Sequence, residues 1–244
     1  EAAGMRVLHE NDQNCYHTTS FGTGQLIADA LDQGAKQVIL GIGGSATNDC
    51  GVGMAAALGY RFLDKKGKEL IPIGKNLIEI RYIVEEKVDP RIREVEFLVA
   101  CDVTNPLYGP DGAAYVYGPQ KGASDEEVEL LDQGLRHMAR LIRSHFGFEV
   151  HNLSGAGAAG GMGAGAMVFL NAELSSGVEL VKQMISFDDK AKGADWIITG
   201  EGKLDSQTLS GKTILGVLSS AHVNGSLLAA LCGRISMSDA RKEM

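Results

Sequence analysis

The sequence contains little cysteine. Only four cysteines are present, and no two have the Cys-x-x-Cys spacing of a zinc or redox site. Cys101 and Cys232 lie inside apolar runs, where free thiols behave as small core residues. We therefore expect reduced cysteines, a cytoplasmic location and no structural zinc.

Proline is also scarce, with five residues, whereas glycine is abundant, with 32 of 244. A glycine excess without proline or a repeat is not typical of a collagen-like or flexible linker sequence. We expect these glycines in loops where the backbone turns tightly or approaches another group closely.

Two further absences limit the partners. No apolar run approaches the roughly 18 residues of a membrane-spanning helix. The net charge is −8, and the chain contains no cluster of Lys and Arg. Nucleic acid and anionic membranes are therefore not expected partners. No signal peptide is recognisable, and the chain begins at Glu1 rather than Met, so we expect it to be part of a longer protein.

Short apolar runs alternate with helical patterns. Four nearly continuous runs, each followed by Gly or Asp, are typical of buried strands: 37–42, 95–101, 194–199 and 227–232. Helical patterns cover 25–34, 124–145, 178–184 and 211–221. The second of these opens with a capping box of Ser124 and Glu127. The alternation predicts an α/β fold, with residues 65–94 as a surface excursion.

Polar clusters follow the predicted strands. Their sequences are GIGGSATND (41–49), CDVTNP (101–106), GPQKG (118–122) and TGEGKLD (199–205), the last continuing to Lys212. Glycine allows backbone N–H groups to approach an anion, carboxylates can hold Mg²⁺, and lysine neutralises developing negative charge. Together these groups resemble the parts of a phosphoryl-transfer site.

The candidate residues come from these clusters. Asp49, Asp102 and Lys212 are candidate catalytic residues, and Glu201 and Asp205 are candidate magnesium ligands. The four carboxylates are expected to converge on one cleft, because the carboxyl ends of parallel strands share an edge. Candidate substrate-binding or nucleotide-binding residues are Gly43, Gly44, Ser45, Asn48, Asn105, Gln120, Lys121, Gly200, Glu201, Gly202 and Gln207.

Each cluster also has a simpler structural interpretation. The 41–49 loop is typical of a tight strand-to-helix turn in which one of residues 47–49 caps the next helix. Asp102 and Asn105 are typical of an Asx turn before a proline. The other charged candidates are also typical of solvated surface side chains: Lys121, Glu201, Asp205 and Lys212.

Two glycine motifs fall short of nucleotide-binding signatures. SQTLSGKT (206–213) has Ser206 in place of the first glycine of a P-loop and does not directly follow the strand. GAGAAG (155–160) matches G-x-G-x-x-G, but no convincing strand precedes it. A closely packed, glycine-rich helix start is the alternative for this second motif.

Six blocks of the sequence resemble those of the type 1 glycerate kinases, in the same order and over essentially the whole chain. There are two departures: Cys50 stands where that family commonly has glycine, and residues 115–117 are bulkier than usual. The blocks are SFGTG (20–24), GIGGSATND (41–49), CDVTNPLYGPDGAA (101–114), GPQKGAS (118–124), GAGAAGGMGAG (155–165) and TGEGKLDSQTLSGKT (199–213).

The resemblance implies ATP-dependent phosphorylation of D-glycerate with magnesium. It also implies two α/β domains, one flavodoxin-like and built from both chain ends, the other inserted between them. Residues 1–190 would be mostly the inserted domain, and residues 191–244 part of an incomplete flavodoxin-like domain. Family members extend further at both ends, so we expect the isolated chain to be less active than the complete protein.

Several points stay open at this stage. The phosphate acceptor is either the C2 or the C3 hydroxyl, and a homo-oligomer is neither indicated nor excluded. The chain could instead be a non-catalytic domain that binds a small hydroxy acid. It could also be another α/β enzyme that uses its glycine-rich loops as an anion site.

Overall fold

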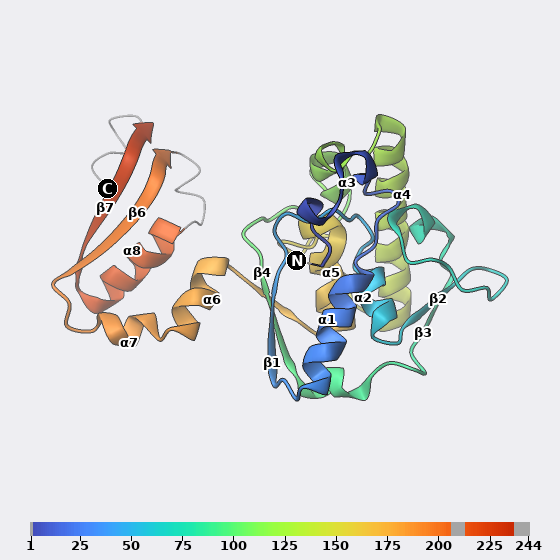
Figure 1. Ribbon diagram of the computed structural model, residues 1–244, viewed down its shortest axis with the longest axis horizontal. Coiled ribbons are helices and arrows are strands. Elements are labelled where there is room, and N and C mark those ends of the chain that lie inside the picture. Colours follow the sequence, from blue (N-terminus) through green and yellow to red (C-terminus); the bar gives the residue numbers. More distant parts are fainter. Residues whose placement is uncertain (1, 206–212, 237–244) are drawn as a thin grey trace. The chain divides into compact units, whose positions relative to one another are not determined.

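The structure is a computed structural model that describes residues 2–205 and 213–236 (Figure 1). It divides into two compact units, unit 1 (Glu1–Leu174) and unit 2 (Ser175–Met244). Both units combine helices with parallel strands, so the α/β class is confirmed. The division lies before the predicted boundary at 190/191, because the helices that follow Leu174 pack within unit 2.

The main sheet of unit 1 has the strand order β1 (Gln37–Gly41), β4 (Glu96–Ala100), β5 (Glu173–Ser175). β1 and β4 are parallel and in register, with Gly41 opposite Ala100 at their carboxyl ends. Figure 1 shows these two strands side by side. Because the strands end together, the loops that follow them leave the same edge of the sheet, where α/β proteins commonly bind ligands.

Five α-helices pack together with this sheet to form the core of unit 1. They are α1 (Phe21–Asp32), α2 (Val52–Ala57), α3 (Ala113–Tyr117), α4 (Asp125–Phe146) and α5 (Ala158–Phe169). One apolar cluster joins α1, the sheet and α5, and another joins α4, α5 and the segment after α2. α5 contributes Met162 to the first and Phe169 to the second. Each such side chain stabilises the fold by about 1.5–3 kcal/mol when fully buried.

α4 confirms the longest predicted helix. Ser124 Oγ accepts from the Glu127 backbone N–H at 3.3 Å, and the Glu127 carboxylate accepts from the Ser124 backbone N–H at 2.8 Å. The helix ends at Gly147, which has a left-handed φ of 69°. The capping box and the spacing of apolar residues therefore predicted both its start and its buried face.

The prediction that residues 65–94 form only a surface excursion is wrong. β2 (Arg61–Leu63) pairs antiparallel with β3 (Tyr82–Val84). Between them η3 (Gly74–Glu79) places the fully buried Leu77 against Gly134 of α4, where an added Cβ would lie 3.0 Å from the Leu77 Cβ. Apolar residues of this segment come singly or in groups of at most three among charged ones, which is too short for a periodic signal.

The glycine-rich start of α5 is closely packed, as the alternative for GAGAAG predicted. An added Cβ on Gly157 would lie 2.1 Å from the carbonyl oxygen of Pro106, and one on Gly160 would lie 2.1 Å from that of Thr47. Ala159 and Gly160 have left-handed φ values of 53° and 70°. The glycines therefore bring this helix start directly against the loops that follow β1 and β4.

The described residues of unit 2 form two parallel strands and three helices. β6 (Trp196–Asp205) pairs with β7 (Leu227–Ser236), with Trp196 opposite Leu227. The helices are α6 (Gly177–Met184), α7 (Phe187–Ala191) and α8 (Thr213–Asn224). β6 continues past Thr199, where the predicted strand ended. Its later residues include Gly and Lys, which are weak strand formers, so the sequence did not indicate this extension.

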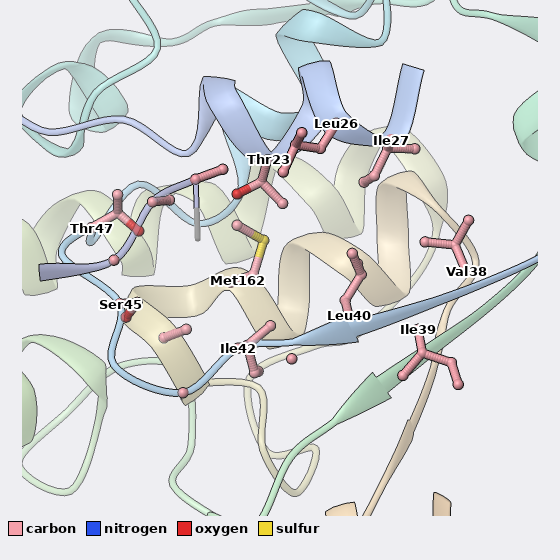
Figure 2. A pocket seen from close by; sticks show the side chains of 16 residues that line it. Thr23, Leu26, Ile27, Val38, Ile39, Leu40, Ile42, Ser45, Thr47 and Met162 are labelled. Atoms are coloured by element: carbon pink, nitrogen blue, oxygen red, sulfur yellow. The ribbon is translucent and has the colours of Figure 1, made fainter. Parts of the chain in front are cut away.

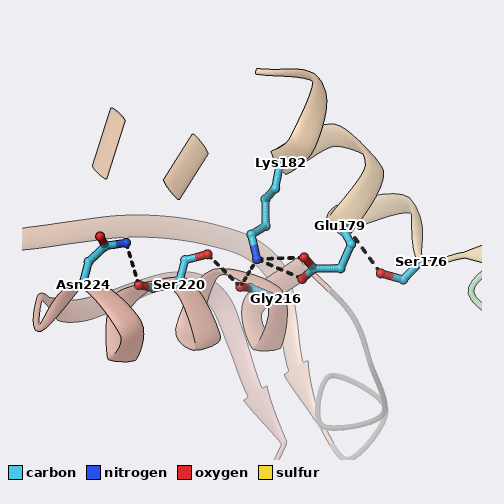
Figure 3. A network of polar contacts seen from close by, with 6 residues as sticks. All are labelled: Ser176, Glu179, Lys182, Gly216, Ser220 and Asn224. Carbon is cyan, nitrogen blue, oxygen red and sulfur yellow. Dashed lines mark hydrogen bonds and ion pairs between the residues drawn. The ribbon is translucent and has the colours of Figure 1, made fainter. Parts of the chain in front are cut away.

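A polar network joins α6 to α8 (Figure 3). The ammonium group of Lys182, whose side chain is only 8% exposed, donates to Glu179 Oε1 at 2.9 Å and to the carbonyl oxygen of Gly216 at 3.1 Å. Ser176 Oγ in turn accepts from the Glu179 backbone N–H at 3.3 Å. An added Cβ on Gly216 would lie 2.7 Å from Val178 Cγ1. These contacts explain why α6 belongs to unit 2.

Candidate functional site

The loops after β1 and β4 enclose a cavity of about 560 Å³ in unit 1. We call it the loop cavity. Its volume lies within the range that small-molecule sites commonly have. It is lined by Met5, Gly41, Ile42, Gly43, Gly44, Ser45, Ala100, Cys101, Asp102, Val103, Tyr117, Gln120, Lys121, Ala158 and Ala159.

Six of the predicted site residues line this cavity. They come from three separate blocks of the sequence: the loop after β1, the loop after β4 and the turn η5 (Pro119–Lys121). The parallel pairing of β1 with β4 brings the first two blocks together. The six residues are Gly43, Gly44, Ser45, Asp102, Gln120 and Lys121.

Lys121 is the buried cation of the loop cavity, with 4% of its surface exposed. Its ammonium donates to Ser45 Oγ at 2.7 Å and to the carbonyl oxygen of Thr47 at 2.9 Å. Burial lowers the pKa of Lys121 to about 8, because desolvation penalises the charged form. Ion pairs within 2–205 and 213–236 include none to Lys121.

Asn105 does not line the loop cavity but contacts a residue that does. Its Oδ1 accepts from the hydroxyl of Tyr117 at 2.6 Å, and its Nδ2 donates to the carbonyl oxygen of Asp111 at 2.9 Å. Tyr117 does line the cavity. The observed contacts of Asn105 therefore orient a wall residue.

Asp49 is fully buried and does not line the loop cavity, and its predicted catalytic role stays a prediction. One oxygen accepts from the backbone N–H and hydroxyl of Ser20, both at 2.7 Å, and from Gly53 N at 3.2 Å; the other accepts from Gly51 N at 3.1 Å. Burial raises the pKa of Asp49, while these donors oppose the shift. These hydrogen bonds tie the start of α2 to the start of α1.

Asn48 is 1% exposed and lies beside Asp49. Neither its amide oxygen nor its amide nitrogen has a hydrogen-bond partner among the described residues, and it does not line the loop cavity. Its predicted binding role stays a prediction. Cys50, two residues after Asn48, has a left-handed φ of 54°. Glycine adopts this conformation without strain, which explains why glycine suits position 50.

A second cavity, of about 320 Å³, lies on β1 and α1 (Figure 2). It shares residues of the 41–45 loop with the loop cavity. Its other walls are mainly aliphatic, including Leu26, Ile27, Val38 and Leu40, and none of its lining residues is charged. This apolar cavity suits an anionic ligand less well than the loop cavity does.

The remaining predicted residues lie in unit 2. Gly200, Glu201 and Gly202 belong to β6, and Asp205 ends it, with a side chain outside the described part. Gln207 and Lys212 lie outside the described residues, as does all of SQTLSGKT except its final Thr213. The convergence of the four carboxylates on one cleft stays a prediction, although Asp49 already does not share the cavity of Asp102.

Nine of the fifteen residues that line the loop cavity were not among the predicted site residues, and Met5, Tyr117 and Ala159 are three of these nine. The Met5 backbone N–H donates to the carbonyl oxygen of Gly44 at 2.9 Å, so the N-terminal segment packs along the first loop. The bulk of residues 115–117 was the only sequence feature that pointed to Tyr117.

Residues 1–243 match the family model described as "Glycerate kinase family". A glycerate kinase of Halalkalibacterium halodurans is 49% identical over 235 residues, which are 96% of this chain and 62% of that protein. A glycerate 2-kinase of Escherichia coli is 45% identical over 216 residues, 88% of this chain and 57% of the relative.

The fold agrees with a crystal structure from Salmonella typhimurium LT2, provisionally named glycerate kinase 2. The TM-score is 0.88 at 40% identity, covering 97% of this chain and 65% of that one. The chain thus spans less than two thirds of the length of these relatives. Its sequence and fold agree with theirs over nearly its whole length, and the chain therefore belongs to the glycerate kinase family.

Proposed function

We propose that the protein transfers the γ-phosphoryl group of ATP to D-glycerate, and that glycerate occupies the loop cavity. One observation carries this proposal: three family-like blocks place Ser45, Asp102, Gln120 and Lys121 around a single cavity. The name glycerate kinase, which several relatives share, supports the choice of substrate.

The chemistry of the loop cavity suits a small hydroxy acid. A buried ammonium, a hydroxyl and an amide come from Lys121, Ser45 and Gln120, and a carboxylate comes from Asp102. Cations and neutral donors bind a carboxylate through charge-assisted hydrogen bonds. A carboxylate can accept a proton from a substrate hydroxyl.

The proposed reaction is a direct phosphoryl transfer. A hydroxyl oxygen of glycerate attacks the γ-phosphorus, the bond to the bridging oxygen breaks, and ADP leaves. The hydroxyl proton goes to Asp102, which we propose as the general base. The acceptor is the C2 or the C3 hydroxyl, and the orientation of glycerate in the cavity decides between them.

We propose that Lys212 is a catalytic residue that offsets the negative charge of the phosphoryl group in transit. The proposed nucleotide-binding residues of unit 2 are Gly200, Glu201, Gly202 and Gln207. Glu201 and Asp205 are the proposed magnesium ligands. No three His, Cys, Asp or Glu side chains gather into a metal site within the described residues. Magnesium is therefore proposed from the family resemblance alone, and no step of the reaction is derived through it.

The proposal includes a cytoplasmic location, supported by the cysteine pattern. None of the helices in the described ranges combines the length and apolarity needed to cross a membrane. Two other functions stay in contention, a non-catalytic hydroxy-acid-binding domain and a different α/β enzyme. Glycerate-dependent release of ADP from ATP distinguishes the kinase from both.

The test measures ADP release with ATP, Mg²⁺ and D-glycerate by the product of the complete reading frame, in parallel with the 244-residue chain. We expect D-glycerate to stimulate ADP release by the complete protein. Asp102→Asn should lower kcat by about 10²-fold or more, the usual loss for a general base. Glycerate binding without ADP release would favour the non-catalytic domain, and no glycerate-dependent signal of either kind would overturn the proposal.

A further inference from the structure

We infer that Lys121 binds the carboxylate of the hydroxy acid and thereby makes the site select acids over neutral polyols. This inference rests on the proposed function, because it places glycerate in the loop cavity. It assigns a role to one side chain and predicts which molecules the site rejects.

The hydrogen bonds of Lys121 leave part of its capacity unused. An ammonium has three N–H donors, and two of them reach Ser45 Oγ and the carbonyl oxygen of Thr47. Both acceptors are neutral. Among residues 2–205 and 213–236, no acceptor is found for the third N–H of this side chain, which lines the loop cavity.

No carboxylate of the described residues compensates this buried charge through an ion pair. Asp49 is near enough to affect Lys121 electrostatically, but its oxygens accept from Ser20, Gly51 and Gly53. Buried ammonium groups are normally paired, because desolvation is costly. By contrast, the buried Lys182 of unit 2 pairs with Glu179 at 2.9 Å. The missing partner of Lys121 is therefore expected to be a ligand anion.

Two anions of the proposed reaction could supply that partner, the carboxylate of glycerate and a phosphate of ATP. The carboxylate is favoured because Lys121 is only 4% exposed, in a pocket shared with Ser45 and the neutral Gln120. A carboxylate is small enough to enter such a site with one N–H as its main contact. Its binding would also orient the rest of glycerate relative to Asp102.

The experiment compares D-glycerate with glycerol, which keeps the hydroxyls but has no carboxylate. Equilibrium binding of each compound, and of ATP, is measured by calorimetry on the complete protein and on Lys121→Met. Lys75→Met serves as the matched control, because Lys75 is an exposed lysine of unit 1 that does not line the cavity.

We expect Lys121→Met to weaken D-glycerate binding by about 10- to 100-fold, the usual contribution of a hydrogen bond to a charged group. Glycerol binding should change little, so the preference for the acid falls. Lys75→Met should keep that preference. If Lys121→Met retains the preference, or loses affinity for ATP alone, the inference is overturned while the kinase proposal stands. If the unsubstituted protein binds no D-glycerate, both are overturned.

Discussion

The burial of Lys121 predicts an unusual dependence of stability on pH. Its pKa is lowered from 10.5 to about 8 in the folded protein, because burial disfavours the charged form. Between pH 8 and 10.5 the unfolded chain therefore holds a proton at this side chain that the folded protein has lost. Because the unfolded state then binds more protons, the free energy of unfolding rises with pH in this window.

The magnitude follows from the size of the shift. One pKa unit corresponds to about 1.4 kcal/mol, so raising the pH from 7 to 10 should stabilise the folded state through Lys121 by roughly 2–3 kcal/mol. Other titrating groups of the chain contribute as well. Lys121→Met removes only the Lys121 contribution, and the difference between the two proteins isolates it.

The assay is urea unfolding of the unsubstituted chain and of Lys121→Met at several values between pH 7 and pH 10. The neighbouring Cys15 does not interfere in the folded state, since burial raises its pKa to about 11; burial also raises the pKa of the cavity residue Tyr117. Saturating D-glycerate should reduce the slope, because a bound carboxylate favours the protonated lysine.

The result that refutes this reasoning is a difference in unfolding free energy that does not change between pH 7 and pH 10. Lys121 would then keep an ordinary pKa, and its ammonium would be hydrated in solution. A decrease with pH would contradict the sign of the argument as well.

Three further predictions concern contacts within unit 1 or within unit 2. Gly160→Ala should destabilise unit 1 by more than about 3 kcal/mol in urea unfolding, because its Cβ would meet the Thr47 carbonyl at 2.1 Å. Gly147→Ala, equally left-handed but with no atom within 4 Å, should cost only about 1 kcal/mol; equal costs would contradict the packing. Asp49→Asn should lower stability by roughly 1–3 kcal/mol, because an amide cannot accept from all four donors; loss of kcat at unchanged stability would support a catalytic role. Glu179→Ala should lower the thermal stability of unit 2 more than Lys182→Met, because only the first leaves a buried ammonium without its anion; the reverse order would contradict this account of the network.

Local signals predicted much of the fold. The apolar runs at 37–42 and 95–101 became the parallel pair β1 and β4, and the Ser124 capping box marked the start of α4. The short strands β2 and β3 were not predicted, because three-residue strands carry no detectable periodicity. β6 continued through residues of weak strand propensity, where pairing with β7 supplies the hydrogen bonds.

The sequence predicted the segments that contain the candidate site but not which of their residues share one cavity. Glycine and polar residues after the strands correctly indicated Ser45, Asp102 and Lys121 as neighbours across the loop cavity. The same signal selected Asp49, which is fully buried and does not line the loop cavity. The sequence could not show this burial, because burial depends on tertiary packing.

The central claim is that D-glycerate binds in the loop cavity, and a crystal structure of the complex tests it most directly. The account predicts the carboxylate of D-glycerate within about 2.7–3.2 Å of Lys121 Nζ, with a hydroxyl group beside Asp102. D-glycerate bound anywhere else, whether in the apolar cavity of Figure 2 or on unit 2, would contradict it.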